Sequence, residues 1–158
     1  MAIVLNWNAW SDTIACMHSL MQADRAPDHI VVCDNGSLDD SLDQLARWMS
    51  DAGHFRAYSS SDAALNDRRS PAELTLVAIG ENGGYAAGNN IGLRFALERT
   101  RADFVWILNS DIVVARDALS SMLDLAISDR TIAIVGAKLL RYDQPDTIQA
   151  LGGGYIFP

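Results

Sequence analysis

Lysine is nearly absent from this sequence of 158 residues, since Lys138 is the only one. Lysine and arginine together number 12 against 20 acidic residues, which gives a formal net charge of -8. Proteins that bind nucleic acids or anionic membranes through charge neutralise phosphates with clustered basic residues. The composition therefore argues against nucleic acid as a partner. An anionic ligand would need a metal ion, backbone amides or a few arginines.

Long apolar runs and cysteines are also scarce. No stretch reaches the roughly 20 apolar residues of a membrane span, and the N-terminus lacks the basic start and apolar run of a signal peptide. The two cysteines, Cys16 and Cys33, fall in apolar segments, which predicts core positions rather than a disulfide or a metal pair. We expect a cytoplasmic protein, and attachment to the inner face of a membrane stays open.

Short apolar segments alternate with segments of helical periodicity along the chain. Strands are predicted over 2–5, 29–33, 74–79, 104–108 and 131–137, a hairpin over 139–140 and 148–151, and helices after each of the first four strands. This order predicts one domain over 1–158, an α/β fold with a mostly parallel sheet and helices on both faces. Residues 51–73 lack periodicity and predict a long polar loop, and a glycine turn follows at 152–154.

The stretch from Phe104 to Asp111 joins five apolar residues to the polar ending Asn109-Ser110-Asp111. A short unbroken apolar run is typical of a central parallel strand, because helices cover both of its faces. We therefore predict a buried strand that delivers the Asp111 carboxylate to the edge of the sheet.

Polar residues also follow the other predicted parallel strands, at 6–8, at Asp34 and at Asn82 with Gly83. The carboxyl ends of parallel strands share one edge, and ligands of open α/β sheets bind there. We therefore expect these side chains to meet Asn109 and Asp111 in one site.

Each of these residues has a functional and a purely structural interpretation. Asp111 and Asn109 offer the oxygen ligands that Mg²⁺ and Mn²⁺ prefer, although a turn after a strand explains the pair as well. Trp7 either stacks on a flat ring or plugs the end of the sheet. Asp34 either leads into a helix or accepts a hydrogen bond from a base or ribose. Gly83 permits either close approach to a phosphate or an ordinary tight turn.

Four motifs, taken in order, resemble those of family 2 inverting glycosyltransferases, and most closely the bacterial rhamnosyltransferase-like enzymes of cell-surface polysaccharide assembly. They extend from Asn6 to Asp111. The motifs are Asn6-Trp7-Asn8 with Asp12-Thr13, Val32-Cys33-Asp34-Asn35-Gly36-Ser37, Glu81-Asn82-Gly83-Gly84-Tyr85-Ala86-Ala87-Gly88-Asn89-Asn90, and Trp106-Ile107-Leu108-Asn109-Ser110-Asp111.

The resemblance implies a GT-A (Rossmann-like) fold, a nucleotide-sugar donor and a divalent metal, Mg²⁺ or Mn²⁺. The D-x-D motif of the family corresponds to Asn109-Ser110-Asp111, which implies Asp111 as the metal ligand and Asn109, in place of the first acid, as a weaker one. Six residues are implied in binding the nucleotide sugar, namely Trp7, Asn8, Asp34, Asn82, Gly83 and Asn89.

The family continues beyond such a glycine turn into an acceptor-binding half that carries the catalytic base. We therefore expect a C-terminally incomplete, donor-binding portion that is inactive alone and has no assigned catalytic residue. The resemblance suggests dTDP-rhamnose as the donor and a saccharide or lipid-linked acceptor. Two alternatives stay open, a nucleotidyltransferase and a non-catalytic nucleotide-binding or interaction module. The first would show a glycine-rich basic loop after the first strand, which 6–10 lacks.

Overall fold

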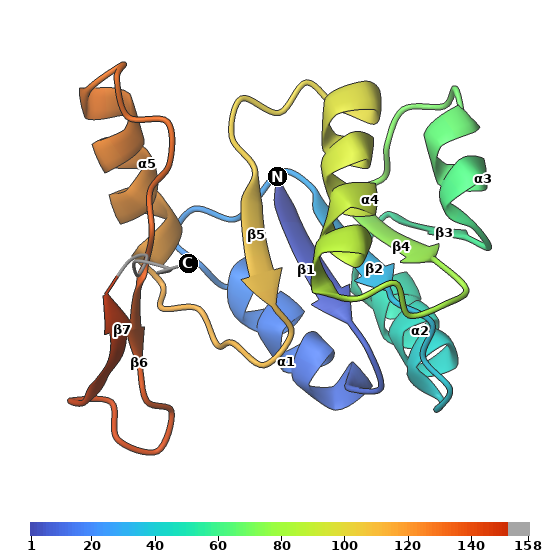
Figure 1. The fold of residues 1–158 in the computed structure, drawn as a ribbon, viewed down its shortest axis with the longest axis horizontal. Coiled ribbons are helices and arrows are strands. Elements are labelled where there is room, and N and C mark those ends of the chain that lie inside the picture. Colours follow the sequence, from blue (N-terminus) through green and yellow to red (C-terminus); the bar gives the residue numbers. More distant parts are fainter. Residues whose placement is uncertain (152–158) are drawn as a thin grey trace, which may run out of the picture.

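The computed structural model describes residues 1–151, so the glycine turn predicted at 152–154 lies outside the described residues. Within 1–151, no helix is both long and apolar enough to cross a membrane. Figure 1 shows the elements in the order β1 (Ala2–Asn6), α1 (Trp10–Met21), β2 (Ile30–Asp34), α2 (Ser41–Ala52), β3 (Phe55–Tyr58), α3 (Ser61–Asn66), β4 (Leu74–Ala78), α4 (Tyr85–Arg99), β5 (Trp106–Asn109), α5 (Ala118–Ser128), β6 (Lys138–Leu140) and β7 (Ile148–Leu151).

The first five strands form a parallel sheet in the order β3-β4-β2-β1-β5. Because every ladder is parallel, the carboxyl ends of these strands share one edge. The register places Asn6 opposite Asp34 and Leu5 opposite Asn109, so the polar strand endings are neighbours. The predicted α/β fold with a mostly parallel sheet is confirmed.

Helices cover both faces of the sheet, as predicted (Figure 1). One core packs α1 and α2 against β1, β2 and β4, and the other packs α3 and α4 against the opposite face. Adjacent strand residues point to opposite faces, so Ile3 and Val4 belong to different cores. Cys16 and Cys33 are buried and free, which confirms them as core residues.

Helix α4 packs directly against the sheet through the glycines on its inner face. A Cβ atom on Gly92 would lie 2.5 Å from Cγ2 of Ile3, and one on Gly88 would overlap the Leu5 side chain. Neither contact leaves room for a larger residue. This packing fixes the start of α4, at Tyr85, beside the carboxyl edge of the sheet.

The prediction of a continuous polar loop over 51–73 is wrong for two segments. Phe55–Tyr58 forms β3, which pairs in parallel with β4, and Ser61–Asn66 forms α3. The Ser60 hydroxyl caps α3 by accepting a hydrogen bond from the Ala63 N–H at 3.1 Å. Both elements are too short for periodicity to show, and pairing and capping define them instead.

Strand β5 occupies an edge of the sheet, so the prediction of a buried central strand is wrong. Among the described residues it pairs with β1 alone, and Phe104 and Ile107 are 44% and 40% exposed. The strand predicted over 131–137 does not form within the described chain, and Ile134 is exposed. An apolar β-rich segment becomes a strand only when another strand pairs with its backbone.

The segment after β5 runs along α1 before α5 begins. The Val114 N–H donates to the Ser19 hydroxyl at 2.9 Å, and Arg116 Nε lies 3.1 Å from Asp24 Oδ1. Helix α5 stands beyond the β5 edge (Figure 1), and the predicted antiparallel hairpin of β6 and β7 is confirmed.

Candidate functional site

A pocket of about 530 Å³ lies at the carboxyl edge of the parallel sheet. Its lining comes from the loops that follow β1, β2, β4 and β5, which is where ligands of open α/β sheets bind. The residues that line it are Leu5, Trp7, Ala9, Asp12, Asn35, Asn82, Gly84, Tyr85, Asn109, Ser110 and Asp111.

The pocket brings together half of the residues that the sequence predicts for the site. Trp7, Asn82, Asn109 and Asp111 line it, as the convergence of strand ends requires. Four others lie behind or beside the lining, and these are Asn8, Asp34, Gly83 and Asn89.

Trp7 is 53% exposed, so it does not plug the end of the sheet. The loop that presents it is held by Asn8, which has the left-handed φ of 50° that asparagine tolerates better than most residues. The Asn8 N–H donates to the Ser37 hydroxyl at 2.9 Å, and its side-chain Oδ1 accepts from the Leu38 N–H at 2.8 Å. Asn8 therefore fixes the conformation from which Trp7 faces the pocket.

Asp34 is buried, with 1% of its surface exposed, and accepts hydrogen bonds at both carboxylate oxygens. Its Oδ2 accepts from Asn6 Nδ2 at 2.7 Å and from the Ser37 hydroxyl at 2.6 Å, while Oδ1 accepts from the Ser37 N–H at 3.0 Å. Thr13 extends this chain by donating to Asn6 Oδ1 at 2.7 Å. The network joins the loops after β1 and β2 beneath the pocket.

Asn89, on the first turns of α4, is also buried and does not line the pocket. Its Nδ2 donates to the Tyr85 carbonyl at 3.0 Å, and its Oδ1 has no hydrogen-bond partner among the described residues. Tyr85 itself lines the pocket and is 58% exposed. The aromatic residue at the start of α4 therefore reaches the pocket, whereas the asparagine four residues later does not.

Besides Tyr85, three lining residues carry polar or charged groups that the sequence did not single out as site residues. Asn35 directly follows Asp34, Ser110 lies between the two residues assigned to the metal, and Asp12 lies in the first turn of α1. For Asn35, the signal was its place one residue beyond a parallel strand. For Asp12, the signal was its place in the Asp12-Thr13 part of the first family motif, and the packing of α1 brings that helix turn to the pocket.

The lining contains two carboxylates, Asp12 and Asp111, and neither lysine nor arginine. Cys16 lies behind the Asn109 end of β5, with its Sγ 3.8 Å from the Asn109 carbonyl oxygen. Burial, with a smaller contribution from the charge of Asp111, raises the pKa of the Cys16 thiol to about 12. The thiol therefore stays protonated at neutral pH.

The donor set at the end of β5 fits a divalent metal that shares its coordination with a phosphate ligand. Asp111 and Asn109 supply oxygen donors with exposed side chains. No group of three or more His, Cys, Asp or Glu residues able to hold a metal occurs within residues 1–151. Mg²⁺ characteristically keeps several waters and binds through one or two carboxylates plus phosphate oxygens, rather than in a cage made by the protein alone.

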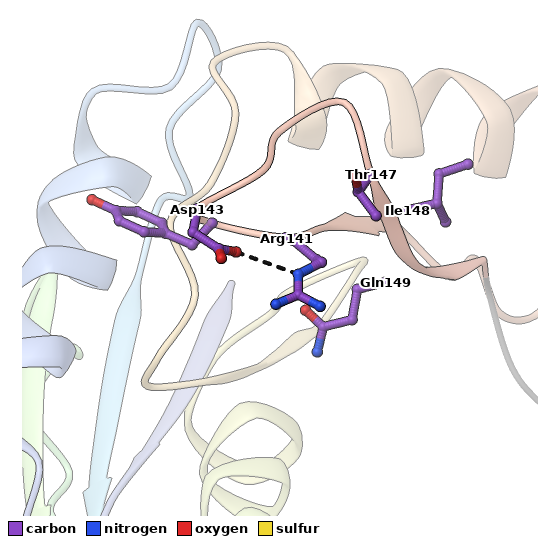
Figure 2. Close-up of a pocket in the computed structure, with 6 residues that line it drawn as sticks. Arg141, Asp143, Thr147, Ile148 and Gln149 are labelled. Carbon is purple, nitrogen blue, oxygen red and sulfur yellow. Dashed lines mark hydrogen bonds and ion pairs between the residues drawn. The ribbon is translucent and has the colours of Figure 1, made fainter.

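A second cavity of about 490 Å³ lies in the β6–β7 hairpin, and Figure 2 shows its lining. Arg141 Nε and Asp143 Oδ1 form an exposed ion pair across 3.3 Å there. None of the residues predicted for the site contributes to this cavity, whose lining is Arg141, Tyr142, Asp143, Thr147, Ile148 and Gln149. The pocket at the strand ends is therefore the candidate functional site.

The sheet order and the pocket at its carboxyl edge define a Rossmann-like α/β domain. The sequence model of "Glycosyl transferase family 2" matches residues 1–152, and the chain belongs to this family. No protein among the curated sequences matches.

Among solved structures, the chain is similar to the mannosyltransferase PcManGT from Pyrobaculum calidifontis, solved in complex with GDP-Man and Mn²⁺. The TM-score is 0.63 at 24% sequence identity, and the match covers 89% of this chain and 35% of the mannosyltransferase. At this identity the similarity shows the fold, which is the GT-A fold. The chain spans about a third of the length of that enzyme.

Proposed function

We propose that this chain binds the nucleotide-sugar donor of a family 2 glycosyltransferase in the pocket at the carboxyl edge of the sheet. The observation that carries the proposal is the convergence of Trp7, Asn82, Asn109 and Asp111, contributed by three different loops, in one pocket of a chain that belongs to this family. The pocket offers an aromatic face, an amide and metal-binding oxygens, which are the groups that a nucleoside diphosphate requires.

In this proposal Trp7, Asn8 and Asp34 serve the nucleoside. Trp7 is the exposed member and offers a ring on which a base can stack. Asn8 and Asp34 would position the loops that hold the nucleoside, because their hydrogen bonds to Ser37 join the loop after β1 to the loop after β2.

Asn82, Gly83 and Asn89 border the nucleotide on the other side of the pocket. Asn82 contributes its side chain directly, since it lines the pocket. Gly83 acts from behind the lining, where its N–H donates to Asn35 Oδ1 and where a Cβ atom would lie 2.9 Å from the Ala87 Cβ. Asn89 supports the start of α4 through its bond to the Tyr85 carbonyl.

Asp111, assisted by Asn109, would hold Mg²⁺ or Mn²⁺ on the diphosphate. The pocket lining carries two carboxylates and no basic side chain, so an anionic diphosphate would be repelled without a cation. When bound, a divalent cation would offset this charge and stabilise the departing nucleoside diphosphate. The mannosyltransferase of similar fold was solved with Mn²⁺, which supports the same class of metal.

We further propose a donor, an acceptor and a cellular location for the chain. The rhamnosyltransferase-like motifs support dTDP-rhamnose, whereas the mannosyltransferase carries GDP-Man. We extend the proposal to a saccharide or lipid-linked acceptor in cell-surface polysaccharide synthesis. Two free buried cysteines support a cytoplasmic setting. We assign no catalytic base among residues 1–151, so the proposed role of the chain itself is donor binding, with transfer weak or absent.

The structure favours this role over a nucleotidyltransferase. The loop after β1 contributes Trp7, Ala9 and Asp12 to the pocket, and none of these could hold a triphosphate by charge. A non-catalytic nucleotide-binding module would bind the donor in the same pocket and show no transfer at all. Release of nucleoside diphosphate when the chain is incubated with donor, metal and acceptor would therefore exclude such a module.

Isothermal titration calorimetry with dTDP, UDP and GDP, each with and without Mn²⁺, tests the proposal directly. We expect at least one of them to bind in a metal-dependent manner, and Asp111→Ala to abolish the dependence on metal. Asp124→Ala is the matched control, because it removes an exposed carboxylate on α5 that does not line the pocket. Metal-dependent binding that survives in Asp111→Ala would refute the metal assignment, and an absence of nucleotide binding would refute the function.

A further inference from the structure

The side chain of Asn82 has a fixed polarity. The Gly84 N–H, which is always a donor, points at one end of the Asn82 amide at 2.9 Å, so that end must be the oxygen. Asn35 Nδ2 donates to the same Asn82 Oδ1 at 2.9 Å. Two donors thus occupy the oxygen of Asn82, and the amide nitrogen is the end left for a ligand.

Asn35 reinforces this polarity, because its own orientation is also fixed by a backbone donor. The Gly83 N–H donates to Asn35 Oδ1 at 3.3 Å, which leaves Nδ2 to donate to Asn82 Oδ1 and, at 3.3 Å, to the Gly84 carbonyl. Asn35 is 3% exposed, and both ends of its side-chain amide form hydrogen bonds to the β4–α4 turn. A residue at the end of β2 therefore clamps the turn that presents Asn82.

Asn82 and the proposed metal ligands lie at opposite ends of the pocket. Asn82 follows β4, whereas Asn109 and Asp111 end β5, and β2 and β1 lie between these strands. Three strand spacings amount to roughly 14 Å. If the diphosphate of a nucleotide lies at Asp111, its base would therefore point toward Asn82. The edge of the base that is farthest from the sugar would then contact the Asn82 amide.

We propose that Asn82 Nδ2 donates a hydrogen bond to the carbonyl oxygen on the sugar-distal edge of the nucleotide base, and that Asn35 is a positioning residue that, together with the Gly84 N–H, holds Asn82 in this orientation. The proposal rests on the proposed function and deepens it by defining the class of base. Uracil, thymine and guanine carry a carbonyl on that edge, whereas cytosine and adenine carry an amino group. The pocket should therefore select the first class.

Calorimetric titrations in Mn²⁺ with UDP against CDP, and with GDP against ADP, test the selection. When the Asn82 amide nitrogen faces an amino group on the base, neither group has a hydrogen-bond acceptor. We therefore expect the wild type to bind UDP about tenfold or more tightly than CDP, and GDP about tenfold or more tightly than ADP. Asn82→Asp keeps an oxygen for Gly84 and Asn35 but presents a second oxygen to the base. This variant should lose the preference while its thermal melting temperature stays close to that of the wild type.

A double-mutant cycle isolates the role of Asn35. Asn35→Asp still accepts from the Gly83 N–H but sets an oxygen against Asn82 Oδ1 in place of a donor. It should therefore disturb the Asn82 orientation that the Gly84 N–H favours and weaken binding by about tenfold. In the Asn82→Ala background there is no amide to orient, and Asn35→Asp should add less than about twofold. A general effect of the new charge would persist in that background. Asn66→Asp, an exposed asparagine on α3, is the matched control.

Each result decides between the inferences. A wild type that binds no nucleotide overturns the proposed function, and this inference with it. Binding without preference for the carbonyl-bearing base, or a preference that Asn82→Asp retains, overturns the inference alone. Additive effects of the Asn35 and Asn82 changes overturn the positioning role. If Asn35→Asp does not fold, Asn35→Ala takes its place in the cycle.

Discussion

Asn6 Nδ2 donates to Asp34 Oδ2 across 2.7 Å at the ends of two adjacent parallel strands, and both residues are almost completely buried. The described ion pairs do not include Asp34, so neutral donors from Asn6 and Ser37 satisfy its carboxylate. A buried carboxylate without a cationic partner depends on such hydrogen bonds. This pair therefore determines how the loops that carry Trp7 and Asn35 are joined.

Asp34→Asn should destabilise the fold. The substitution keeps the shape of the side chain but sets an amide nitrogen against one of the donors on Asn6 or Ser37. We expect a loss of about 1–3 kcal/mol in the free energy of unfolding, measured by urea denaturation. Asp39→Asn is the control, because Asp39 is exposed in the same loop and the new amide oxygen can still accept from the Ser41 N–H. This substitution should change stability by less than about 0.5 kcal/mol. Equal effects of the two substitutions would show that the buried network does not stabilise the fold.

Gly36→Ala should destabilise the fold more than Gly80→Ala. Both glycines have left-handed φ angles, +73° and +95°, and both substitutions carry that backbone strain. Only at Gly36 would the new Cβ meet backbone, 2.6 Å from the Glu81 carbonyl carbon, whereas the Gly80 position is open. The expected excess is about 1–3 kcal/mol from overpacking, measured by thermal denaturation of both variants. A Gly80 variant that is equally or more destabilised would contradict the contact.

Trp7→Ala should weaken nucleotide binding without weakening the fold. Trp7 is half exposed, so its removal forfeits little core packing. Stacking of a base on an aromatic ring is worth about 1–3 kcal/mol, which corresponds to roughly 5- to 150-fold in affinity. Calorimetry on Trp7→Ala and on Trp7→Phe, which keeps a ring, measures the effect. An alanine variant that binds as the phenylalanine variant does would argue against stacking.

Stability should fall at alkaline pH through the buried thiol of Cys33. Burial raises its pKa to about 12 from the value of 9.0 expected for the unfolded chain. The unfolded state therefore releases the proton first, so the contribution of this thiol is fully present below pH 9 and is lost as pH rises from 9 to 12. One such group changes the unfolding free energy by up to about 1.4 kcal/mol per pH unit.

Urea denaturation at pH 7.5, 9 and 10 measures this dependence. The Cys33→Ala variant, whatever its stability at pH 7.5, should lose less stability between pH 9 and pH 10 than the wild type. Parallel losses in the two proteins would show that Cys33 does not cause the alkaline dependence.

The sequence predicted the parallel sheet and the residues at its strand ends because both depend on local patterns. Apolar runs that end in Asn6, Asp34 and Asn109 identify strands, and parallel topology then makes their ends converge. The sequence could not place β5 at an edge, because its apolar composition matches that of a central strand. Strand order depends on pairing between distant segments, which composition does not encode.

The site was predicted in part for a similar reason. Residues that follow a strand directly, such as Trp7 and Asp111, could be identified as lining the pocket. The family resemblance assigns Asp34 and Asn8 to the nucleoside. In the structure, Asp34 is hydrogen-bonded to Ser37 and Asn8 to Leu38, both within the protein. Only the three-dimensional structure separates a polar side chain that faces a ligand from one that supports the loop behind it.

The edge position of β5 links the proposed metal ligands to the local order of the strand that carries them. Within the described residues, β5 has a single ladder partner, so its backbone can open at a lower free-energy cost than that of β1 or β2. A ligand that requires Asn109 and Asp111 in place binds the closed form and stabilises it. If the proposed donor binds there, its affinity depends on the same equilibrium as the fraying of this strand. A substitution that loosens β5 should then lower the affinity without removing a contact to the ligand.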